Sequence, residues 1–285
     1  MNENSLPKTL SIQEWLRQAR DQLVQHDIAS AQLDAEIILA HTLRKPRTYL
    51  HAHDDEILEP RYREIADARL ELRLDFVPIA YIIGHKEFYG RRFKVTTATL
   101  IPRPESETMI DLLKGLSPKT LALIPDKKRL VDVGTGSGCL GITAKLELPE
   151  LDVILTDTSR HALNVAAQNA KILGADIILH KGDLLHGYSM PIDIILANLP
   201  YVDRTWEVSR ETQAEPASAL YAENQGLALI NKLIIQASQL LTPEGSLFLE
   251  ADPRQHSAII ANAKQYGLVH IQTVGFIVLL QKSAD

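Results

Sequence analysis

The chain has 285 residues, 45% of them hydrophobic and 23% charged, a composition that excludes a disordered or fibrous protein and suits one large domain or two ordinary ones. The formal net charge of −6 argues against a protein whose main partner is a phosphate backbone, because such proteins usually carry a basic face. One cysteine excludes an internal disulfide, the N-terminus lacks a secretory pattern, and no apolar run approaches the roughly 20 residues of a membrane span, so we expect a cytoplasmic protein.

The first 77 residues predict a small domain made only of helices. A capping box from Ser11 to Glu14 opens a helix whose apolar residues recur at helical intervals: Trp15, Leu16, Ala19 and Leu23. A second helix opens at Ser30 and ends before Pro46. A third spans about residues 60–73 and should turn these residues inward: Ile65, Ala68, Leu70 and Leu72.

Residues 78–104 predict a linker that contains a β-hairpin. Gly90 lies between two runs of β-favouring residues, which is typical of a tight turn. Pro102 and Pro104 then fix an extended path, and a helix can start at Glu105. The linker therefore separates the helical domain from the C-terminal part of the chain.

From residue 105 to residue 285 predicted strands and helices alternate, after a helix end and loop at 116–128. Strands are expected at 130–133, 151–155, 177–179, 192–197 and 246–250, and helices at 139–148, 161–173, 226–241 and 254–266. That order implies an α/β domain with a doubly wound, mostly parallel sheet covered by helices on both faces. Two further β-rich runs around Gly275 predict an antiparallel hairpin at one edge.

The first strand of this domain runs into a glycine-rich loop and then a helix. The loop contains Asp132, Gly134, Thr135, Gly136, Ser137 and Gly138. Its glycines let a ligand touch the backbone before a helix N-terminus, but their spacing is neither that of a dinucleotide fold nor that of a phosphate loop. The loop predicts a site for a bulky, weakly charged ligand beside the Asp132 carboxylate, and read alone it also fits a tight strand–helix turn.

Polar residues follow the next two strands. Asp157 is placed to accept hydrogen bonds from the two hydroxyls of a ribose, and it also fits an N-cap for the helix that starts at Ser159. Asp183 offers an acceptor for an adenine amino group and Leu184 a cover for the ring, although alone the two are more typical of a turn. Because open α/β sheets bind ligands at the carboxyl ends of their strands, the three strand ends together favour a nucleoside cofactor.

The fourth strand delivers Asn198, Leu199, Pro200 and Tyr201 to the same edge. Asn198 brings a side-chain carbonyl, and the following proline holds the backbone carbonyl of Leu199 extended beside it. Two neighbouring acceptors suit a planar –NH2 group with two donors, and Tyr201 can lie along that group and exclude water. When these two oxygens accept hydrogen bonds from both N–H groups, electron density returns to the nitrogen and is directed at an electrophilic methyl group. The tetrad therefore predicts methyl transfer without a strong base.

The glycine loop, the acidic strand end and this tetrad resemble class I S-adenosylmethionine-dependent methyltransferases that act on planar nitrogen. Upstream, residues 87–90 (Glu-Phe-Tyr-Gly) and 100–107 (Leu-Ile-Pro-Arg-Pro-Glu-Ser-Glu) resemble the linker of the release-factor glutamine methyltransferases. Downstream, Glu215-Pro216 and Gly226-Leu227 are similar to that family's stretch after the tetrad. The resemblance covers nearly the whole chain, and its specific part is the pairing of the Pro-Arg-Pro-Glu segment with the tetrad.

The resemblance implies a seven-stranded Rossmann-like methyltransferase sheet and a helical domain that recognises the substrate. It implies methyl transfer from S-adenosylmethionine, which leaves S-adenosylhomocysteine, to the side-chain amide nitrogen (N5) of the glutamine in the Gly-Gly-Gln motif of peptide chain release factors. The resemblance also implies that the tetrad is catalytic and that it binds the substrate together with Arg103. It implies that the cofactor is bound by these residues: Asp132, Gly134, Thr135, Gly136, Ser137, Gly138, Asp157, Asp183, Leu184 and Asn198.

We expect a monomer that uses no metal and has release factors, not nucleic acid, as its partners. One alternative is an adenine-N6 methyltransferase on RNA or DNA, because the same tetrad occurs in some ribosomal RNA adenine methylases. A second alternative is a translation-associated protein that binds the cofactor without turnover. The chain departs from the family where Leu199 replaces a usual proline, where Ser106 replaces a usual threonine, and in a closing hairpin without the usual acidic and arginine residues.

Three other features have more than one interpretation. His51 and His53 lie near acidic residues and suggest a metal site, but such a cluster in a polar loop is more typical of solvated surface. Cys139 starts a helix, and we interpret it as a small packing residue because no partner for a reactive thiol is near it in sequence. Arg103 is either a surface cation or a group that lines the substrate entrance.

Overall fold

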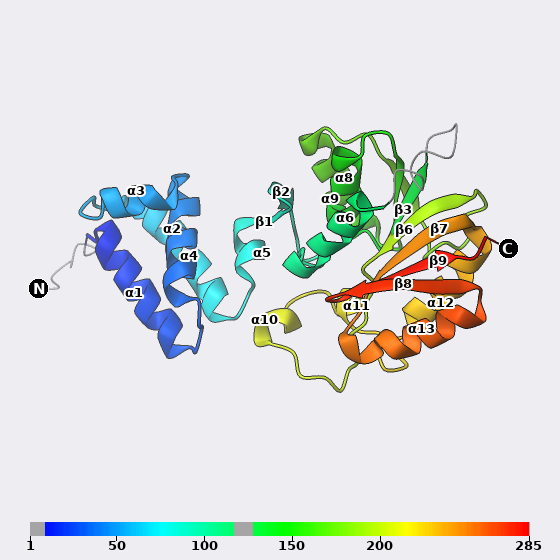
Figure 1. Ribbon diagram of the computed structural model, residues 1–285. Helices are drawn as coiled ribbons and strands as arrows, with labels where there is room; N and C mark the ends of the chain where they lie inside the picture. Colours follow the sequence, from blue (N-terminus) through cyan, green and yellow to red (C-terminus); the bar gives the residue numbers. More distant parts are fainter. Residues whose placement is uncertain (1–8, 117–127, 285) are drawn as a thin grey trace, which may run out of the picture. The chain divides into compact units, whose positions relative to one another are not determined.

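The computed structural model describes residues 9–116 and 128–284, and its chain divides into two compact units (Figure 1). The first unit comprises Met1–Gly84 together with Arg210–Ala214, and the second comprises His85–Ser209 and Glu215–Asp285. Nearly all of the predicted helix end and loop at 116–128 lies outside the described residues. The division of the chain into three regions at residues 77 and 104 stays a prediction.

The first unit is helical, as predicted. Its elements are α1 (Ile12–Gln25), α2 (Ala31–Leu43), α3 (Arg47–Ala52), α4 (Pro60–Leu74), α5 (Ile79–Ile83) and α10 (Arg210–Gln213). The capping box of α1 is confirmed, because the Ser11 hydroxyl accepts from the Glu14 backbone N–H at 3.2 Å while the Glu14 carboxylate accepts from the Ser11 N–H at 3.0 Å. The apolar residues predicted to face inward from α1 are all buried in the core of the unit.

The inward face predicted for α4 is wrong. Only Leu70 is buried, and the other three predicted residues are exposed, namely Ile65, Ala68 and Leu72. The buried stripe of the helix runs instead through Ala66, Leu70 and Arg73. The prediction followed the apolar residues, whereas this helix turns a charged residue into the core and rotates its apolar positions accordingly.

Arg73 carries a buried charge, since only 1% of its side chain is exposed. Its Nε donates to the buried carboxylate of Asp34 at 2.7 Å, and its Nη2 donates to Glu211 in α10. The same oxygen of Asp34 accepts from the Ser30 hydroxyl at 2.6 Å. Burying a guanidinium is tolerated only when its charge is paired and hydrogen-bonded, and this set of contacts meets that condition.

The second unit begins with the predicted hairpin, formed by β1 (His85–Phe88) and β2 (Arg91–Lys94). A seven-stranded sheet comes next, made of β3 (Arg129–Val133), β4 (Asp152–Asp157), β5 (Ile178–Lys181), β6 (Ile192–Ala197), β7 (Leu241–Glu250), β8 (Leu268–Val274) and β9 (Ile277–Lys282). Its described helices are η1 (Pro104–Ser106), α6 (Glu107–Lys114), α8 (Cys139–Glu147), α9 (Arg160–Leu173), α11 (Ala217–Leu220), α12 (Ala228–Leu240), η2 (Pro253–Gln255) and α13 (His256–Gln265).

The strand order is β5-β4-β3-β6-β7-β9-β8. The first five strands in that order run parallel, and β9 runs antiparallel to both β7 and β8. The predicted doubly wound, mostly parallel sheet is therefore confirmed, as is the closing antiparallel hairpin, with β8 at the edge. The order reverses at β3, since β4 lies on one side of it and β6 on the other.

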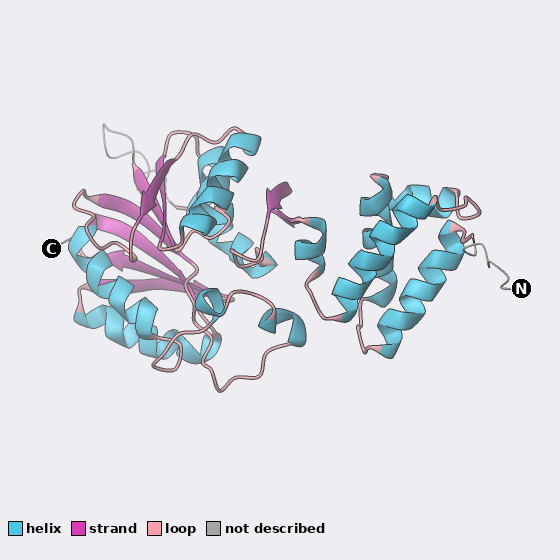
Figure 2. Ribbon diagram, turned by 180° about the vertical axis from the view of Figure 1, so that it is seen from behind, coloured by secondary structure: helices cyan, strands magenta, loops and turns pink. Residues whose placement is uncertain are grey.

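Helices cover both faces of the sheet (Figure 2). One face packs on α6 and α8 through residues such as Met109 and Leu140, and the other packs on α12 and α13 through residues such as Ile234 and Ile259. Because alternate residues of a strand point to opposite faces, the part of a strand that is covered on both sides must be apolar, which explains the uninterrupted apolar run at 194–197. Among the described helices, none is long and apolar enough to cross a membrane.

We expect Arg73→Met to lower the free energy of unfolding by about 3–5 kcal/mol, because it leaves the Asp34 carboxylate buried without its charge partner. Arg20→Met is the matched control: Arg20 pairs with Asp21 at 2.7 Å, but both side chains are about half exposed, so the loss should stay below about 1 kcal/mol. Urea denaturation of the full chain measures both losses. Losses of equal size would show that the Arg73 pair does not stabilise the first unit.

Candidate functional site

Three parallel strands reach one edge of the sheet in register. Val133 at the end of β3 is aligned with Thr156 of β4 and with Ala197 of β6, so the segments after these strands start side by side. The backbone N–H groups of Gly134 and Thr135 both donate to the Thr156 carbonyl at 2.9 Å, which ties the glycine loop to β4. This edge is the point where the strand order reverses, and open α/β sheets bind ligands at such points.

Asp132 turns its carboxylate into the loop that it begins. Its Oδ2 accepts from the Thr135 hydroxyl at 2.6 Å and from the Gly141 backbone N–H at 2.9 Å. Burial raises the pKa of the Asp132 carboxyl to about 6, against the lowering effect of these two hydrogen bonds. Asp132 thus fastens the loop to α8, and its contact with a cofactor stays a prediction.

Three glycines give the loop its shape. Gly134, Gly136 and Gly138 have φ values of 72°, 54° and 82°, a region that other L-residues rarely adopt. A Cβ on Gly138 would lie 2.6 Å from a side chain of α8, whereas a Cβ on Gly136 would have its nearest neighbour 4.0 Å away. The backbone at Gly136 is therefore open to the approach of a ligand. Ser137 lies buried beside it, and its carbonyl accepts from Nδ2 of Asn169 at 2.8 Å.

Asp157 lies beside the glycine loop, because its Oδ2 accepts from the Gly136 backbone N–H at 3.0 Å. Its Oδ1 accepts from the Ser159 backbone N–H at 2.8 Å. The N-cap of α9 is Ser159, whose hydroxyl accepts from the Ala162 N–H, so the interpretation of Asp157 as that N-cap is wrong. An ionised carboxylate has about four lone-pair sites, so these two contacts leave acceptor capacity for two hydroxyl groups.

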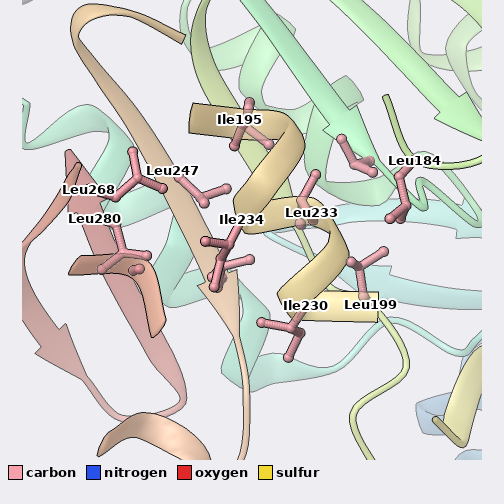
Figure 3. Packing of buried hydrophobic residues seen from close by; sticks show 14 of the residues in the cluster. Leu184, Ile195, Leu199, Ile230, Leu233, Ile234, Leu247, Leu268 and Leu280 are labelled. Atoms are coloured by element: carbon pink, nitrogen blue, oxygen red, sulfur yellow. The ribbon is translucent and has the colours of Figure 1, made fainter. Parts of the chain in front are cut away.

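Asp183 and Leu184 come after β5 at the next strand end. Asp183 accepts from Lys232 at 2.5 Å, and about half of each side chain is exposed. Leu184 has a φ of 54° and buries its side chain in the core cluster that α12 completes, near Leu199 (Figure 3). The side chain of Leu184 is therefore committed to the core, and the assignment of both residues to an adenine site stays a prediction.

The tetrad begins where β6 ends, next to the glycine loop. A Cβ on Gly134 would lie 2.8 Å from Cδ2 of Leu199 and 4.0 Å from the backbone oxygen of Asn198. Leu199 is 3% exposed and packs in the core with Ile230 and Leu233 of α12 (Figure 3). The side chain of Leu199 thus belongs to the core, so only its backbone groups are available at the edge of the sheet.

The polar side chains of the tetrad are held by residues from other elements. Nδ2 of Asn198 donates to the Ser106 hydroxyl at 3.1 Å, and the Tyr201 hydroxyl donates to Glu250 at 3.3 Å. Burial and the nearby Glu250 carboxylate raise the pKa of Tyr201, so its hydroxyl stays protonated. Glu250 ends β7, and its neighbour Leu249 is aligned with Ala197 of β6, which brings it to the same edge.

The backbone carbonyl of Tyr201 is held by a hydrogen bond and by close packing. Nε2 of Gln255, itself 4% exposed, donates to the carbonyls of Tyr201 and Gln225 at 2.8 Å each. Gly226 lies against the same carbonyl, since a Cβ there would be 1.9 Å from the Tyr201 oxygen. The tetrad therefore has a fixed path, and only glycine fits at position 226.

Arg103 is neither a free surface cation nor a free lining group. Its Nη2 donates to the buried carboxylate of Glu215, whose other oxygen accepts from the Ile101 backbone N–H at 3.0 Å. One third of the Arg103 side chain remains exposed, so its contact with a substrate stays a prediction.

Four residues that hold the site in place have no role predicted from the sequence: Ser106, Glu215, Glu250 and Gln255. A carboxylate after an apolar strand is the signal that selected Asp157, and the same signal is present at Glu250. Nothing local marks Gln255, because its partners are backbone carbonyls in distant segments.

The competing features do not form a second centre. Burial raises the pKa of the Cys139 thiol to about 12, so it is an unreactive packing group, consistent with its contacts in the core under α8. His53 stacks on Tyr49 with 4.0 Å between ring centroids, and Nε2 of His51 lies 3.7 Å from Glu36. Within residues 9–116 and 128–284, no group of three or more His, Cys, Asp and Glu is placed to hold a metal ion.

Comparison with known proteins gives matches across both units. Two family models match, the PrmC N-terminal domain over residues 14–84 and the Methyltransferase small domain over residues 112–215. A release factor glutamine methyltransferase from Deinococcus radiodurans is 33% identical over 261 residues, which cover 90% of this chain and 92% of that protein. A bifunctional methyltransferase from Rickettsia felis is 34% identical over 277 residues, which cover 87% of this chain and 53% of that protein.

A solved structure of a methyltransferase from Pyrococcus furiosus shares the fold, with a TM-score of 0.51 at 17% identity over 76% of this chain and 98% of that one. The seven-stranded methyltransferase sheet predicted from the sequence is therefore confirmed.

We expect Gly226→Ala to destabilise the protein far more than Gly174→Ala. Both glycines have positive φ, 81° and 73°, so both variants carry the same left-handed strain of about 1–2 kcal/mol. Only at Gly226 does the new methyl group also meet the Tyr201 backbone, because nothing lies within 4 Å of a Cβ at Gly174. Urea denaturation should show an additional loss of about 2 kcal/mol or more for Gly226→Ala. Equal losses would contradict the tight contact with the tetrad.

Proposed function

Because the chain belongs to the release factor glutamine methyltransferase family, we propose that it transfers a methyl group from S-adenosylmethionine to a glutamine side-chain amide of a peptide chain release factor. The acceptor in this proposal is the N5 nitrogen of the Gly-Gly-Gln glutamine. The first unit recognises the release factor, and the chain acts as a monomer in the cytoplasm. The observation that carries the proposal is the alignment of Val133 with Ala197, which puts the glycine loop and the tetrad side by side.

The residues around the glycine loop fit S-adenosylmethionine. The open backbone at Gly136 accepts close approach of a bulky group, and the Asp157 carboxylate retains acceptor sites for the two ribose hydroxyls. The remaining candidate contacts are Asp132, Gly134, Thr135, Ser137, Gly138, Asp183, Leu184 and Asn198. The cofactor supplies an electrophilic methyl group on a sulfonium, so the reaction requires no metal.

The tetrad activates the acceptor by orienting it. A carboxamide nitrogen is a weak nucleophile because its lone pair is delocalised into the carbonyl. In the proposed mechanism Oδ1 of Asn198 and the backbone carbonyl of Leu199 accept hydrogen bonds from the two N–H groups of the substrate amide. These hydrogen bonds localise electron density on the nitrogen and fix the direction of its lone pair. Tyr201, protonated and clamped by Gln255, lies along the amide plane and keeps water out. Arg103 borders the entrance while it holds Glu215.

The adenine-N6 alternative rests on the same tetrad. Such an enzyme must neutralise phosphates and receive an unstacked base. The net charge of −6 favours a protein substrate, and the Deinococcus radiodurans relative is named for one. A binding protein without turnover would keep the cofactor site and lose the reaction, so turnover distinguishes it.

We expect S-adenosylhomocysteine to raise the melting temperature of the full chain, because a ligand that binds only the native state stabilises it. Asp157→Asn should weaken that binding about tenfold or more, since a neutral amide is a poorer acceptor for two hydroxyls. Asp21→Asn, at an exposed carboxylate, is the control and should leave the affinity unchanged. Thermal unfolding of the wild type measures the rise in melting temperature, and isothermal titration calorimetry measures the affinity of all three proteins for S-adenosylhomocysteine. An unchanged affinity in Asp157→Asn would remove the ribose assignment.

We expect tritiated methyl from S-adenosylmethionine to enter a bacterial release factor at its Gly-Gly-Gln glutamine. The label should vanish when that glutamine is replaced by alanine, and Asn198→Ala should lower turnover at least about 100-fold while it leaves cofactor affinity nearly unchanged. Bare ribosomal RNA and DNA should stay at background. Labelled nucleic acid with an unlabelled release factor would establish the adenine alternative, and cofactor binding with no labelled product would establish the binding protein.

A further inference from the structure

A chain of hydrogen bonds links the tetrad to the end of β7. Nδ2 of Asn198 donates to the Ser106 hydroxyl at 3.1 Å, and that hydroxyl donates to Oε2 of Glu250 at 2.5 Å. The other oxygen of Glu250, Oε1, accepts from the Tyr201 hydroxyl at 3.3 Å. Ser106 and Glu250 are 2% and 1% exposed, so their hydrogen bond is shielded from water, whereas Asn198 and Tyr201 are half-buried. Three separate segments, η1, the tetrad and β7, thus meet in one buried polar network.

The network has a direction because an ionised carboxylate can only accept. Ser106 must give its single hydroxyl hydrogen to Glu250, and its lone pairs can then only accept from Asn198. The branch of the Asn198 amide that faces Ser106 is therefore –NH2. The carbonyl branch, Oδ1, points away from Ser106 and remains able to accept. In the reversed amide the –NH2 would face the –NH2 of the substrate, and two donors cannot bond to each other.

We propose that Ser106 and Glu250 are positioning residues that lock the Asn198 amide with its carbonyl oxygen toward the substrate nitrogen. The inference rests on the proposed function, because the orientation matters only for an acceptor that donates N–H bonds. Neither residue touches the substrate, and both act through Asn198. The chemical requirements are a hydroxyl at position 106 and, at position 250, a group that can accept but not donate.

The lock depends on the charge of Glu250. Burial raises the pKa of its carboxyl to about 6, with hydrogen bonds from Ser106, Tyr201 and Asn198 itself opposing the rise and the nearby Glu105 carboxylate adding to it. A protonated Glu250 has a hydrogen of its own to donate, so Ser106 is no longer forced to donate to it and can donate to Asn198 instead. The reversed amide then becomes accessible. The locked fraction, and with it kcat, should fall as the pH drops below about 6.

Three other titratable groups near this network, Tyr201, Cys139 and Asp252, keep their state over the same pH range, whereas the Asp132 carboxyl, whose pKa is also raised to about 6, titrates within it. The pKa of Tyr201 is raised and that of Cys139 on α8 is raised to about 12, so both stay protonated. Asp252 lies just after β7, and its hydrogen bonds with Arg254 hold the pKa of its carboxyl below the usual range. Arg103 faces Tyr201 and opposes the rise in the pKa of its hydroxyl. Glu250 and Asp132 therefore both titrate on the acid limb, and Glu250→Gln separates them because it removes only the Glu250 contribution.

The first test measures kcat and KM of the full chain with a release factor as substrate. Ser106→Ala should lower kcat about tenfold or more, with KM and S-adenosylhomocysteine affinity nearly unchanged, while Ser106→Thr keeps the hydroxyl and should retain most of the activity. Thr143→Val is the matched control: it also removes a buried hydroxyl from this unit, but that hydroxyl has no hydrogen-bond partner among the described residues. A loss in Ser106→Ala no larger than that in the control overturns the inference.

The pH profile is the readout that a merely structural role would not move. Between pH 7.5 and pH 5 the wild-type kcat should fall about tenfold, with an apparent pKa near 6. Glu250→Gln should have a lower kcat that falls clearly less over this range, because its amide does not titrate and only the Asp132 contribution remains. An acid limb that persists unchanged in Glu250→Gln overturns the inference.

A second readout does not need activity, so it separates this inference from the proposed function. The side-chain amide signals of Asn198 in a nitrogen-15 NMR spectrum can be assigned by their loss in Asn198→Asp. In the wild type at pH 7.5 these two hydrogens should exchange with water at least about tenfold more slowly than in Ser106→Ala or Glu250→Gln. If no release factor is methylated but this protection is seen, the proposed function fails and the lock stands. Equal exchange in all three proteins removes the lock, whatever the substrate.

Discussion

The parallel alignment of β3, β4, β6 and β7 is the constraint on which the rest of the site depends. Parallel strands end at one edge, about 4.8 Å apart, so residues just after them become neighbours however distant they are in sequence. Val133, Ala197 and Leu249 occupy aligned positions, and the glycine loop, the tetrad and Glu250 come directly after them in the chain. A shift of one residue in any of these strands would exchange the side chains that it presents to the two cores, so the close packing of both cores fixes the alignment and thereby the site.

Two buried carboxylates hold this edge together at a cost in solvation. Asp132 and Glu250 each have a pKa raised to about 6 by burial, which is the mark of a charged form that loses water on folding. Each is compensated by hydrogen-bond donors from neighbouring segments: Asp132 by Thr135 and a backbone N–H, Glu250 by Ser106, Tyr201 and Asn198. A buried acid that accepts from two segments fixes their relative position more tightly than an apolar contact does, because hydrogen bonds are directional.

The sequence predicts the features whose causes are local. Periodicity and caps indicate the helices, apolar runs between turn residues indicate the strands, and positive-φ demands explain the glycine loop. Prediction from the sequence fails where a residue's environment is set by segments that are distant along the chain. The inward face predicted for α4 is wrong because Arg73 is buried by pairing with Asp34 from another helix, and no pattern within α4 carries that information. Glu250 and Ser106 are missed as site residues because the neighbours that give them a role are chosen by strand order, which alternating strands and helices leave open.

Leu199 shows how a departure from a family pattern can be absorbed. The position has two separate duties, since its backbone faces the edge of the sheet while its side chain fills the core against Ile230 and Leu233. A proline there would stiffen the backbone, whereas the leucine fixes the same stretch by burying apolar surface, which contributes about 3 kcal/mol or less. The neighbouring Gly134 makes room for it, because a Cβ on that glycine would lie 2.8 Å from the leucine side chain. Packing of the leucine side chain thus replaces the stiffness of a proline, and the carbonyl that takes part in the proposed mechanism belongs to the backbone in both cases.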